Sequence, residues 1–302
     1  KGRPFSDPLI VHIADEDALE LLTTDIPEKA KRLAQAFWPG PLTLILPRGP
    51  QVPDLVTAGL KTVAIRMPSH PVALALIRAV GSPIAAPSAN RFMHVSPTTA
   101  RHALADLAGR VPLILDGGPA EVGVESTVLD LCSAVPRILR PGGVSLEALR
   151  GALPDVQPPL VRNARNADTG TQRDAEAQKA PGQLLTHYAP TIPFLLFDGT
   201  VEAMRAAMLA EVQHRRERGE RVGVLVADED VAAFEGSGTP IYSLGDANAP
   251  VQVASALFAG LRTLEDAHVD VILCRNFDEH GLGLAIRDRL LKAAGGKVFG
   301  QE

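Results

Sequence analysis

A long polar stretch interrupts the sequence and divides it into two parts with different patterns. Residues 154–183, PDVQPPLVRNARNADTGTQRDAEAQKAPGQ, have almost no apolar periodicity and are rich in Pro, Asn, Asp, Gln and Arg. Such a segment cannot offset its ordering entropy by burying apolar surface, which is typical of a linker or a mobile flap. Since 302 residues suffice for two domains, we predict a first domain over residues 1–153, a linker or lid over 154–189, and a second domain over 190–302.

The second part alternates between continuous apolar runs and amphipathic helical periods. This pattern predicts a parallel sheet covered by helices on both faces, as in a small Rossmann-like domain. The expected strands span 192–198, 221–227 and 269–275, and the expected helices span 201–218, 251–267 and 281–294. Gly281 and Gly283 favour a packing turn over a phosphate-binding loop, because the third glycine is missing and the turn follows the last strand.

The first part is less regular, with short apolar runs that end at Pro, Gly or Ser. It predicts an α/β or α+β sheet, with an irregular strand order. Strands are expected over 9–13, 42–47, 62–68, 83–89, 112–118 and 126–131, and helices over 27–37, 71–80, 98–108 and 145–153.

Composition excludes several classes of function. Residues 1–150 carry 15 Lys and Arg against 14 Asp and Glu, and residues 151–302 carry 15 against 21, so neither half has the cationic excess of a protein that holds a nucleic-acid backbone. Aromatic residues make up only 4%, which argues against a stacking surface for single strands. No apolar run approaches the ~18 residues of a membrane span. The two cysteines, Cys132 and Cys274, lie in apolar runs and are expected to be reduced core thiols of a cytoplasmic protein.

Cationic residues recur at the ends of strands in the first part. Arg66 interrupts an apolar strand in KTVAIRMP, and Arg140 ends a strand in RILRPGG. An unpaired buried guanidinium is costly, so Arg66 needs an anion, either a ligand or the carboxylate of a structural salt bridge. Together with Lys1 and Arg3, these residues would concentrate positive charge on a nearly neutral domain, which favours a small polyanionic ligand.

The segment AAPSANRFMHVSPTTA, residues 85–100, combines hydroxyls, an amide and tight turns. Ser88, Asn90 and Ser96 suit phosphate or carboxylate binding. Alternatively, Ser96 caps the following helix, with Pro97 in its first turn; a capped helix start can also bind an anion. Residues alone favour a core role for His12, and Ser126 enters a strand after a glycine-rich loop.

The motifs KGRP…PLIVHI, WPGPLTLIL, TVAIRMPSHPVALALI, PIAAPSAN, VSPT, GVESTVLDL and ILRPGG resemble the YrdC-like family of threonylcarbamoyl-adenylate synthases. The stretches PGQLLTHYAP and GLGLAIRDRLLKAA resemble its two-domain form. The resemblance covers nearly the whole chain and implies an α/β fold: a twisted mixed-sheet YrdC-like domain with a concave positive face, plus a smaller Rossmann-like domain.

The resemblance also implies roles for individual residues. In this family the K-x-R and S-x-N motifs lie near the phosphates and are assigned to catalysis. The matching residues here are Lys1, Arg3, Ser88 and Asn90. The ATP contacts are Arg3, Asp7, Thr62, Ser88, Ser96 and Arg140, with His187 and Tyr188 of the linker as a lid over the nucleotide. The threonine contacts are His12, Arg66, Ala86 and Ser126, with Arg66 pairing with the amino-acid carboxylate.

The implied reaction is synthesis of L-threonylcarbamoyl-AMP from L-threonine, bicarbonate and ATP, with release of pyrophosphate. Mg²⁺ is expected to be held by the ATP phosphates and not by a protein metal site. The product would serve tRNA threonylcarbamoyl-transfer proteins that modify adenosine 37, with no membrane or stable nucleic-acid complex for this enzyme.

The alternatives are a non-enzymatic RNA-binding module and a carbamoyl-adenylate-forming domain of the hydrogenase-maturation type. The family also has an upstream strand and a P-T-x-T-V-Y-G-L stretch that contributes to the threonine pocket. Since the sequence begins inside the K-x-R motif, we expect this part of the pocket to be missing from it.

Overall fold

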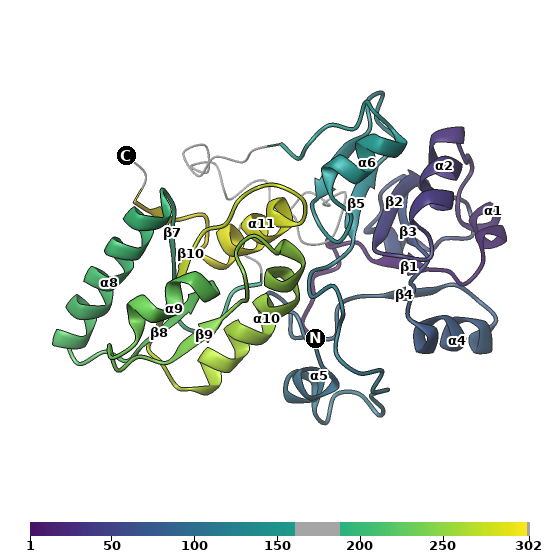
Figure 1. The fold of residues 1–302 in the computed structure, drawn as a ribbon. Helices are drawn as coiled ribbons and strands as arrows, with labels where there is room; N and C mark the ends of the chain where they lie inside the picture. The colour runs from purple at the N-terminus through teal and green to yellow at the C-terminus, as the bar shows by residue number, and fades with distance from the viewer. Residues whose placement is uncertain (161–187, 301–302) are drawn as a thin grey trace. The chain divides into compact units, whose positions relative to one another are not determined.

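The computed structural model describes residues 1–160 and 188–300, and Figure 1 traces them from purple to yellow. The contacts between residues divide the chain into two compact units. The N-terminal unit contains residues 2–88 and 125–160, and the C-terminal unit contains Lys1 with residues 89–124 and 188–300. This division differs from the predicted domains, because residues 89–124 contribute Val95 and Val124 to the core of the C-terminal unit.

The N-terminal unit is built on a mixed six-stranded sheet with the order β4-β1-β3-β2-β5-β6. Its strands are β1 (Ile10–His12), β2 (Leu42–Pro47), β3 (Thr62–Arg66), β4 (Ile84–Ala86), β5 (Thr127–Asp130) and β6 (Arg137–Arg140). The β1–β3 and β2–β5 pairs are parallel, and the β1–β4, β2–β3 and β5–β6 pairs are antiparallel. The irregular strand order expected from the sequence is confirmed.

Side-chain alternation gives the two faces of this sheet different characters. Alternate residues such as Leu42, Leu44 and Leu46 enter a large apolar core, which also contains Leu33 of α2 and Leu149 of α6. The opposite face has only a small apolar cluster, which consists of Ile10, Ile45, Ala64 and Val128 with Leu139. Since successive strand residues point to opposite faces, polar residues between the core positions gather on this second face.

The helices of the N-terminal unit are mostly short. They are η1 (Glu16–Ala18), α1 (Leu19–Leu22), α2 (Glu28–Phe37), α3 (Asp54–Thr57), α4 (Pro71–Val80) and α6 (Leu146–Ala152). Helix α4 begins with Pro71 in its first turn and ends at Gly81, which adopts a left-handed conformation (φ 69°). These are the residue types that start and stop helices, and the predicted span is confirmed.

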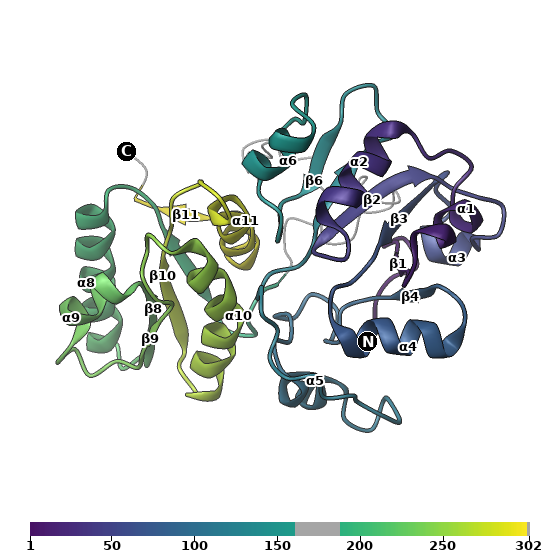
Figure 2. The same cartoon turned by 45° about the vertical axis from the view of Figure 1, so that its right-hand side comes forward.

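The C-terminal unit contains a five-stranded sheet with the order β11-β7-β10-β8-β9, in which every neighbouring pair is parallel. Its elements are β7 (Phe194–Phe197), α8 (Val201–Glu217), β8 (Val222–Val226), α9 (Asp228–Phe234), β9 (Ile241–Ser243), α10 (Pro250–Asp266), β10 (Val271–Arg275), α11 (Gly283–Ala293) and β11 (Val298–Phe299). Figure 2 shows α8 and α9 on one face and α10 and α11 on the other. The predicted Rossmann-like arrangement is therefore confirmed.

The glycine turn before α11 has a packing role. A Cβ added to Gly283 would lie 1.9 Å from the carbonyl oxygen of Asp278, so only glycine allows this backbone approach.

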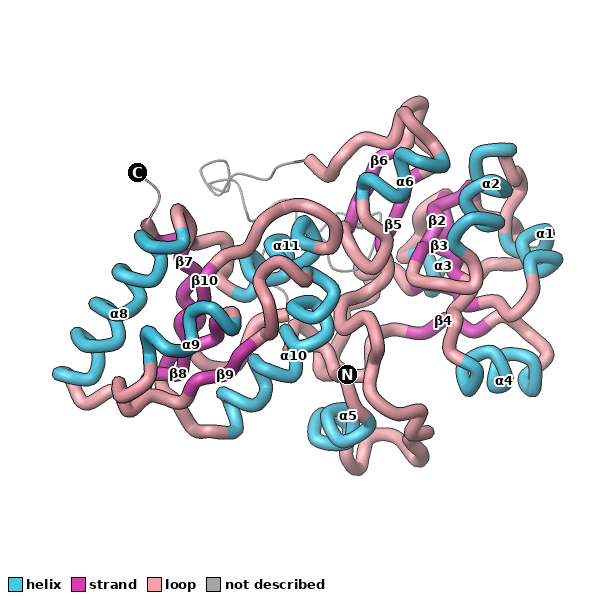
Figure 3. The backbone as a smooth tube through the Cα atoms, in the orientation of Figure 1, coloured by secondary structure: helices cyan, strands magenta, loops and turns pink. Residues whose placement is uncertain are grey.

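Residues 89–124 form α5 (Ala100–Leu107) flanked by loops, as Figure 3 shows. The helix cap is Thr99, whose side chain accepts a hydrogen bond from the His102 N–H, so the predicted capping role of Ser96 is wrong. The strand predicted over 112–118 is also absent from the described structure. Leu113 and Leu115 are exposed there, and no strand of either sheet pairs with this segment.

Two further expectations need correction. The start of the predicted linker is ordered, since Val156 is buried and Gln157 pairs with Arg137 of β6. Only Cys274 is a core thiol; Cys132 is exposed because it lies just beyond the end of β5. Among the described residues, no helix is long and apolar enough to cross a membrane.

Candidate active site

Polar side chains form a row across the second face of the six-stranded sheet. His12 lies beside Arg66 in the β1–β3 pairing, and Val128 lies beside both Thr43 and Arg140. In the antiparallel β2–β3 pair, Leu44 lies beside Ile65, so the next pair in the same register is Thr43 with Arg66. Because paired residues share a face, an imidazole, two guanidinium groups and a hydroxyl lie along one row.

Arg66 is the last residue of β3, and its Nε donates a 2.9 Å hydrogen bond to the Gly40 carbonyl. Within residues 1–160 and 188–300, it forms no ion pair with a carboxylate. Burial and the nearby charge of Arg140 lower the pKa of Arg66 to about 10. The structure therefore does not support the structural salt bridge left open by the sequence, and this cation is well suited to an anionic ligand.

Arg140 is fixed against Ser126. Its Nη2 donates to the Ser126 carbonyl at 2.9 Å and to the Ser126 Oγ at 3.1 Å. The same Oγ lies 2.7 Å from the Oγ1 of Thr43. The RPGG turn holds this arrangement, because a Cβ on Gly142 would lie 2.3 Å from the Glu125 carbonyl oxygen. The strand and the turn therefore position Arg140 and both hydroxyls together.

His12 is held neutral at the end of β1. Burial and the charge of Arg66 lower the pKa of His12 to about 4. Its Nδ1 is buried without a hydrogen-bond partner in the part of the chain that the structure describes. A neutral imidazole with an unsatisfied ring nitrogen is available to a ligand, and this argues against the core role that residues alone favoured.

The other predicted residues of the N-terminal unit lie on β3 and β4 or on the loops that flank β1 and β4. Ala86 pairs with Ile10, and Thr62 begins β3 on the same face as Arg66. Arg3 and Asp7 form an ion pair at 3.6 Å before β1. Ser88 is exposed just after β4.

Lys1, Asn90 and Ser96 belong to the C-terminal unit. The Lys1 Nζ donates to the backbone carbonyl of Asn90 at 2.8 Å and to its Oδ1 at 3.1 Å. The Asn90 amide donates to the His94 carbonyl at 2.8 Å, which closes a tight loop. The structure therefore brings Lys1 and Asn90 of the predicted set into contact, while Arg3 and Ser88 of that set belong to the N-terminal unit. Ser96 is buried.

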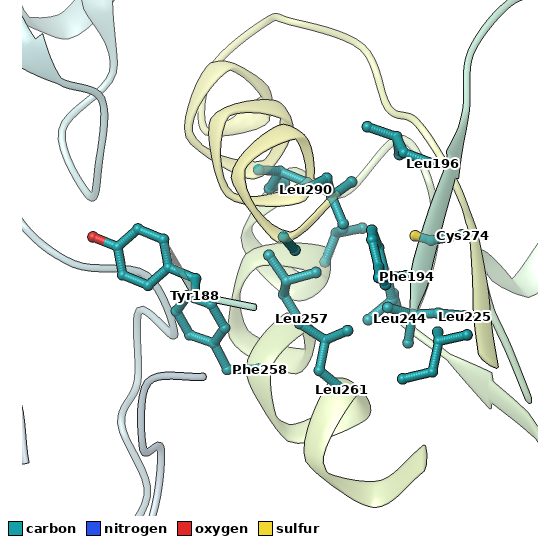
Figure 4. Packing of buried hydrophobic residues seen from close by; sticks show 14 of the residues in the cluster. Tyr188, Phe194, Leu196, Leu225, Leu244, Leu257, Phe258, Leu261, Cys274 and Leu290 are labelled. Carbon is teal, nitrogen blue, oxygen red and sulfur yellow. The ribbon is translucent and has the colours of Figure 1, made fainter. Parts of the chain in front are cut away.

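Tyr188 is a core residue in the structure. It is 2% exposed and packs against Phe258 of α10, with ring centroids 5.7 Å apart, and under the guanidinium of Arg289. Figure 4 shows its ring beside Phe258 at the edge of the apolar cluster. This position does not fit a lid that opens and closes over a nucleotide. His187, the other predicted lid residue, lies outside the described residues.

Thr43 and Gly142 were missed by the sequence analysis. Thr43 stands between Leu42 and Leu44, so alternation in LTLIL assigns it to the face opposite the core and could have indicated it. The role of Gly142 depends on contact with residues 125–126, and short-range sequence patterns carry no signal for that contact.

The fold and these side chains define an α/β protein with a mixed sheet that bears a cationic, polar face, joined in one chain to a Rossmann-like domain. Residues 1–142 match a family model for the Sua5, YciO and YrdC proteins, described as "Telomere recombination". Residues 144–295 match a second model, described as "Threonylcarbamoyl-AMP synthase, C-terminal domain".

Curated relatives agree with both family models. A threonylcarbamoyl-AMP synthase of Bacillus subtilis is 46% identical over 99% of this chain and 82% of its own length, and one of Pyrococcus abyssi is 41% identical over 99% and 83%. The crystal structure of P. abyssi Sua5 complexed with L-threonine superposes with a TM-score of 0.88, at 40% identity over 99% of this chain and 83% of that one. The chain belongs to the threonylcarbamoyl-AMP synthase family.

Proposed function

We propose that this protein is an L-threonylcarbamoyladenylate synthase, a nucleotidyltransferase that makes threonylcarbamoyl-AMP and pyrophosphate from L-threonine, bicarbonate and ATP. The relatives' names and the threonine complex of the P. abyssi protein support this activity. The observation that carries the proposal is Arg66, a strand-end cation without a carboxylate partner among the described residues, within a polar row on one sheet face.

Threonine would bind along this row. Arg66 has the fork geometry to take the amino-acid carboxylate in two parallel hydrogen bonds. The His12 Nδ1, buried and unsatisfied, can form a hydrogen bond with a polar group of the substrate, as acceptor or donor according to the tautomer, because the ring is neutral near pH 7. The small side chain of Ala86 and the hydroxyl of Ser126 would complete the contacts.

The chemistry begins with the threonine amine. Its lone pair adds to the carbon of bicarbonate-derived CO₂, and loss of one proton leaves a carbamate. A carbamate oxygen then attacks the α-phosphorus of ATP while the bond to the bridging oxygen breaks, which releases pyrophosphate. Two anions must meet and phosphoryl charge must be stabilised, so positioned cations contribute more than a protein nucleophile.

ATP contacts are proposed within each unit. In the N-terminal unit, Arg140 is fixed by Ser126, and Arg3, Asp7, Thr62 and Ser88 complete the proposed set. In the C-terminal unit, the proposed residues are Lys1, Asn90 and Ser96, with His187 from the end of the linker.

The His187–Tyr188 pair has added support as a functional segment. It is the chain's only neighbouring His–Tyr pair, and a solved P. abyssi Sua5 variant replaces such a pair by alanine. Since Tyr188 is anchored in the core, we assign it to fixing the chain that follows the linker, and we keep His187 as the proposed nucleotide contact of this pair.

Mg²⁺ enters the proposal together with ATP. We propose that the ATP phosphates supply its ligands, where the ion would neutralise phosphate charge. We further propose a cytoplasmic location and transfer of the product to tRNA by separate proteins.

The test is pyrophosphate release by the purified full-length protein, which retains the family's upstream segment, with labelled substrates. We expect release only when threonine, bicarbonate, ATP and Mg²⁺ are all present, with threonylcarbamoyl-AMP as the product. Release without threonine, or tight salt-sensitive tRNA binding with no adenylate formed, would refute the proposed activity.

A further inference from the structure

Arg262 is a buried cation on α10 whose partners lie in the distant 89–124 segment. It is 8% exposed, and its helix neighbours Leu261 and Leu264 belong to the core of the parallel sheet. A guanidinium in this position must be hydrogen-bonded to repay its desolvation. The residues that satisfy it are therefore fixed with respect to α10.

The guanidinium of Arg262 bonds to the segment at two places. Its Nη2 donates to the Val95 carbonyl and, at 2.8 Å, to the Asp106 Oδ2, while its Nε donates to the Ser96 carbonyl at 3.4 Å. Two of the three acceptors are consecutive backbone carbonyls. One side chain thus holds both the loop backbone and α5, which carries the 6% exposed Asp106.

Other contacts hold the same segment against this unit. The Ala189 N–H donates to the Met93 carbonyl at 3.2 Å. A Cβ on Gly123 would lie 2.2 Å from the Ala254 carbonyl oxygen of α10, so the backbones touch there. The segment is therefore fixed at both ends and in the middle.

The loop held in this way contains Asn90. Asn90 is fully buried, accepts the Lys1 ammonium and donates to the His94 carbonyl, one residue before the carbonyls that Arg262 binds. A continuous set of hydrogen bonds therefore runs from α10 through the loop backbone to Lys1. A shift at Val95 would reach Asn90 through the neighbouring His94 carbonyl, to which the Asn90 amide donates.

We propose that Arg262 is a positioning residue, through which the Rossmann-like domain sets the conformation of the Asn90–Ser96 loop for nucleotide binding. The proposal rests on the function proposed above for Lys1, Asn90 and Ser96. It gives the second domain a role in ATP affinity, with little effect on threonine, whose proposed contacts are on the other unit's sheet.

Arg275 provides a matched control in the same unit. It is also 8% exposed and donates from Nη1 to the Asp230 Oδ2 at 2.7 Å. Its hydrogen-bond partners, Asp230 and the Asn276 carbonyl, lie outside the 89–124 segment. Arg275→Gln thus removes a comparable buried cation without touching the loop.

The experiment compares Arg262→Gln, Arg262→Lys and Arg275→Gln in the full chain by pyrophosphate release and amide hydrogen exchange. For Arg262→Gln we expect the KM for ATP to rise about tenfold, the KM for threonine to stay within about twofold, and exchange over residues 89–108 to accelerate. Arg262→Lys should recover part of the ATP affinity. Arg275→Gln should lower the melting temperature yet keep both KM values and the slow exchange of residues 89–108.

Equal changes in Arg262→Gln and Arg275→Gln, or an unchanged KM for ATP in Arg262→Gln, would overturn the proposal. If Arg262→Gln does not fold, Arg262→Lys carries the test, with an intermediate KM for ATP expected and a wild-type value contradicting us. If the wild-type chain releases no pyrophosphate, the proposed function fails separately. In that case the amide hydrogen exchange of residues 89–108 still tests the positioning role. Faster exchange in Arg262→Lys than in Arg275→Gln supports this role, and equal exchange in the two variants refutes it.

Discussion

An apolar strand ends in an arginine in both sheets, and the two arginines have different surroundings. Arg66 ends β3 in TVAIR and Arg275 ends β10 in VILCR. Arg275 is buried against Asp230, which also binds Arg205, and lies 5.1 Å from the ring centroid of Phe277. Arg66 has a carbonyl partner, Gly40, and no carboxylate among the described residues.

The difference arises from the residues that neighbouring elements supply to each arginine. In the parallel sheet, the first turn of α9 after β8 supplies Asp230 to Arg275. In the mixed sheet, the neighbours of Arg66 are His12 and Thr43, neither of which carries negative charge. A strand-end arginine is therefore structural where a neighbouring element supplies its counter-ion, and open to a ligand where none does.

The largest expected effect is that of Arg66→Ala on catalysis. Loss of two charge-assisted hydrogen bonds to a carboxylate, about 3 kcal/mol, should lower kcat/KM for threonine about 100-fold. The melting temperature should be held or raised, because a cation without a carboxylate partner is removed. Steady-state pyrophosphate release and calorimetry measure the two effects.

Arg66→Lys is the matched variant, since it keeps the charge and loses the fork. It should recover only part of the lost kcat/KM. A clear drop in stability for Arg66→Ala, with threonine kinetics intact, would place Arg66 in the same structural class as Arg275.

The next effect is a pH dependence of stability from His12. Its lowered pKa means that the folded state binds fewer protons than the unfolded state between about pH 4 and 6.5. The stabilisation of the folded state by neutral His12 is therefore complete above pH 6.5 and is lost as the pH falls toward 4. Between pH 7 and 5, His12 should lower the free energy of unfolding by about 2 kcal/mol.

Denaturant unfolding of the wild type and of His12→Asn at both pH values isolates this contribution. The variant should lose about 2 kcal/mol less than the wild type on acidification. Parallel pH profiles for the two proteins would show that His12 is not held neutral by the fold.

Arg275→Gln should cost about 1–2 kcal/mol of stability. The cost stays below that of breaking an isolated buried pair because Arg205 still binds Asp230 at 2.7 Å. Threonine kinetics should be unchanged. Loss of threonine binding in this variant, measured by calorimetry, would remove the distinction between the two arginines.

The two thiols give the smallest effect, a difference in labelling without a change in stability. Burial raises the pKa of Cys274, whereas Cys132 is exposed. A thiol reagent should modify Cys132 alone in the folded protein, and both cysteines after unfolding. Mass spectrometry that found Cys274 modified first would contradict the packed core of the parallel sheet.

Much of the fold could be predicted from local patterns. The periodicity of the second half indicated β7, α8, β8, α10, β10 and α11, because each buries an apolar face. Short elements such as β9 and β11 were missed, since a few residues carry little periodicity. The strand expected over 112–118 failed because an apolar run also needs a partner strand, and local sequence does not specify one.

The site was only partly predictable. Strand-end polarity indicated Arg66 and Arg140, and alternation was sufficient to indicate Thr43. Residues alone could not decide whether Arg66 had a counter-ion, because Asp230 and Arg275 show that such a partner can be 45 residues away in sequence. The burial of Tyr188 likewise depends on α10 and α11, far along the chain.

The central claim is that the mixed sheet recognises the carboxylate of threonine through Arg66. Its most direct test is calorimetric titration of the wild-type chain with L-threonine and with threoninol, which replaces the carboxylate by a hydroxymethyl group. We predict that threonine binds and that threoninol binds at least about 100-fold more weakly, with this preference abolished in Arg66→Ala. Equal affinity for the two compounds, or a preference that survives in Arg66→Ala, would contradict the account.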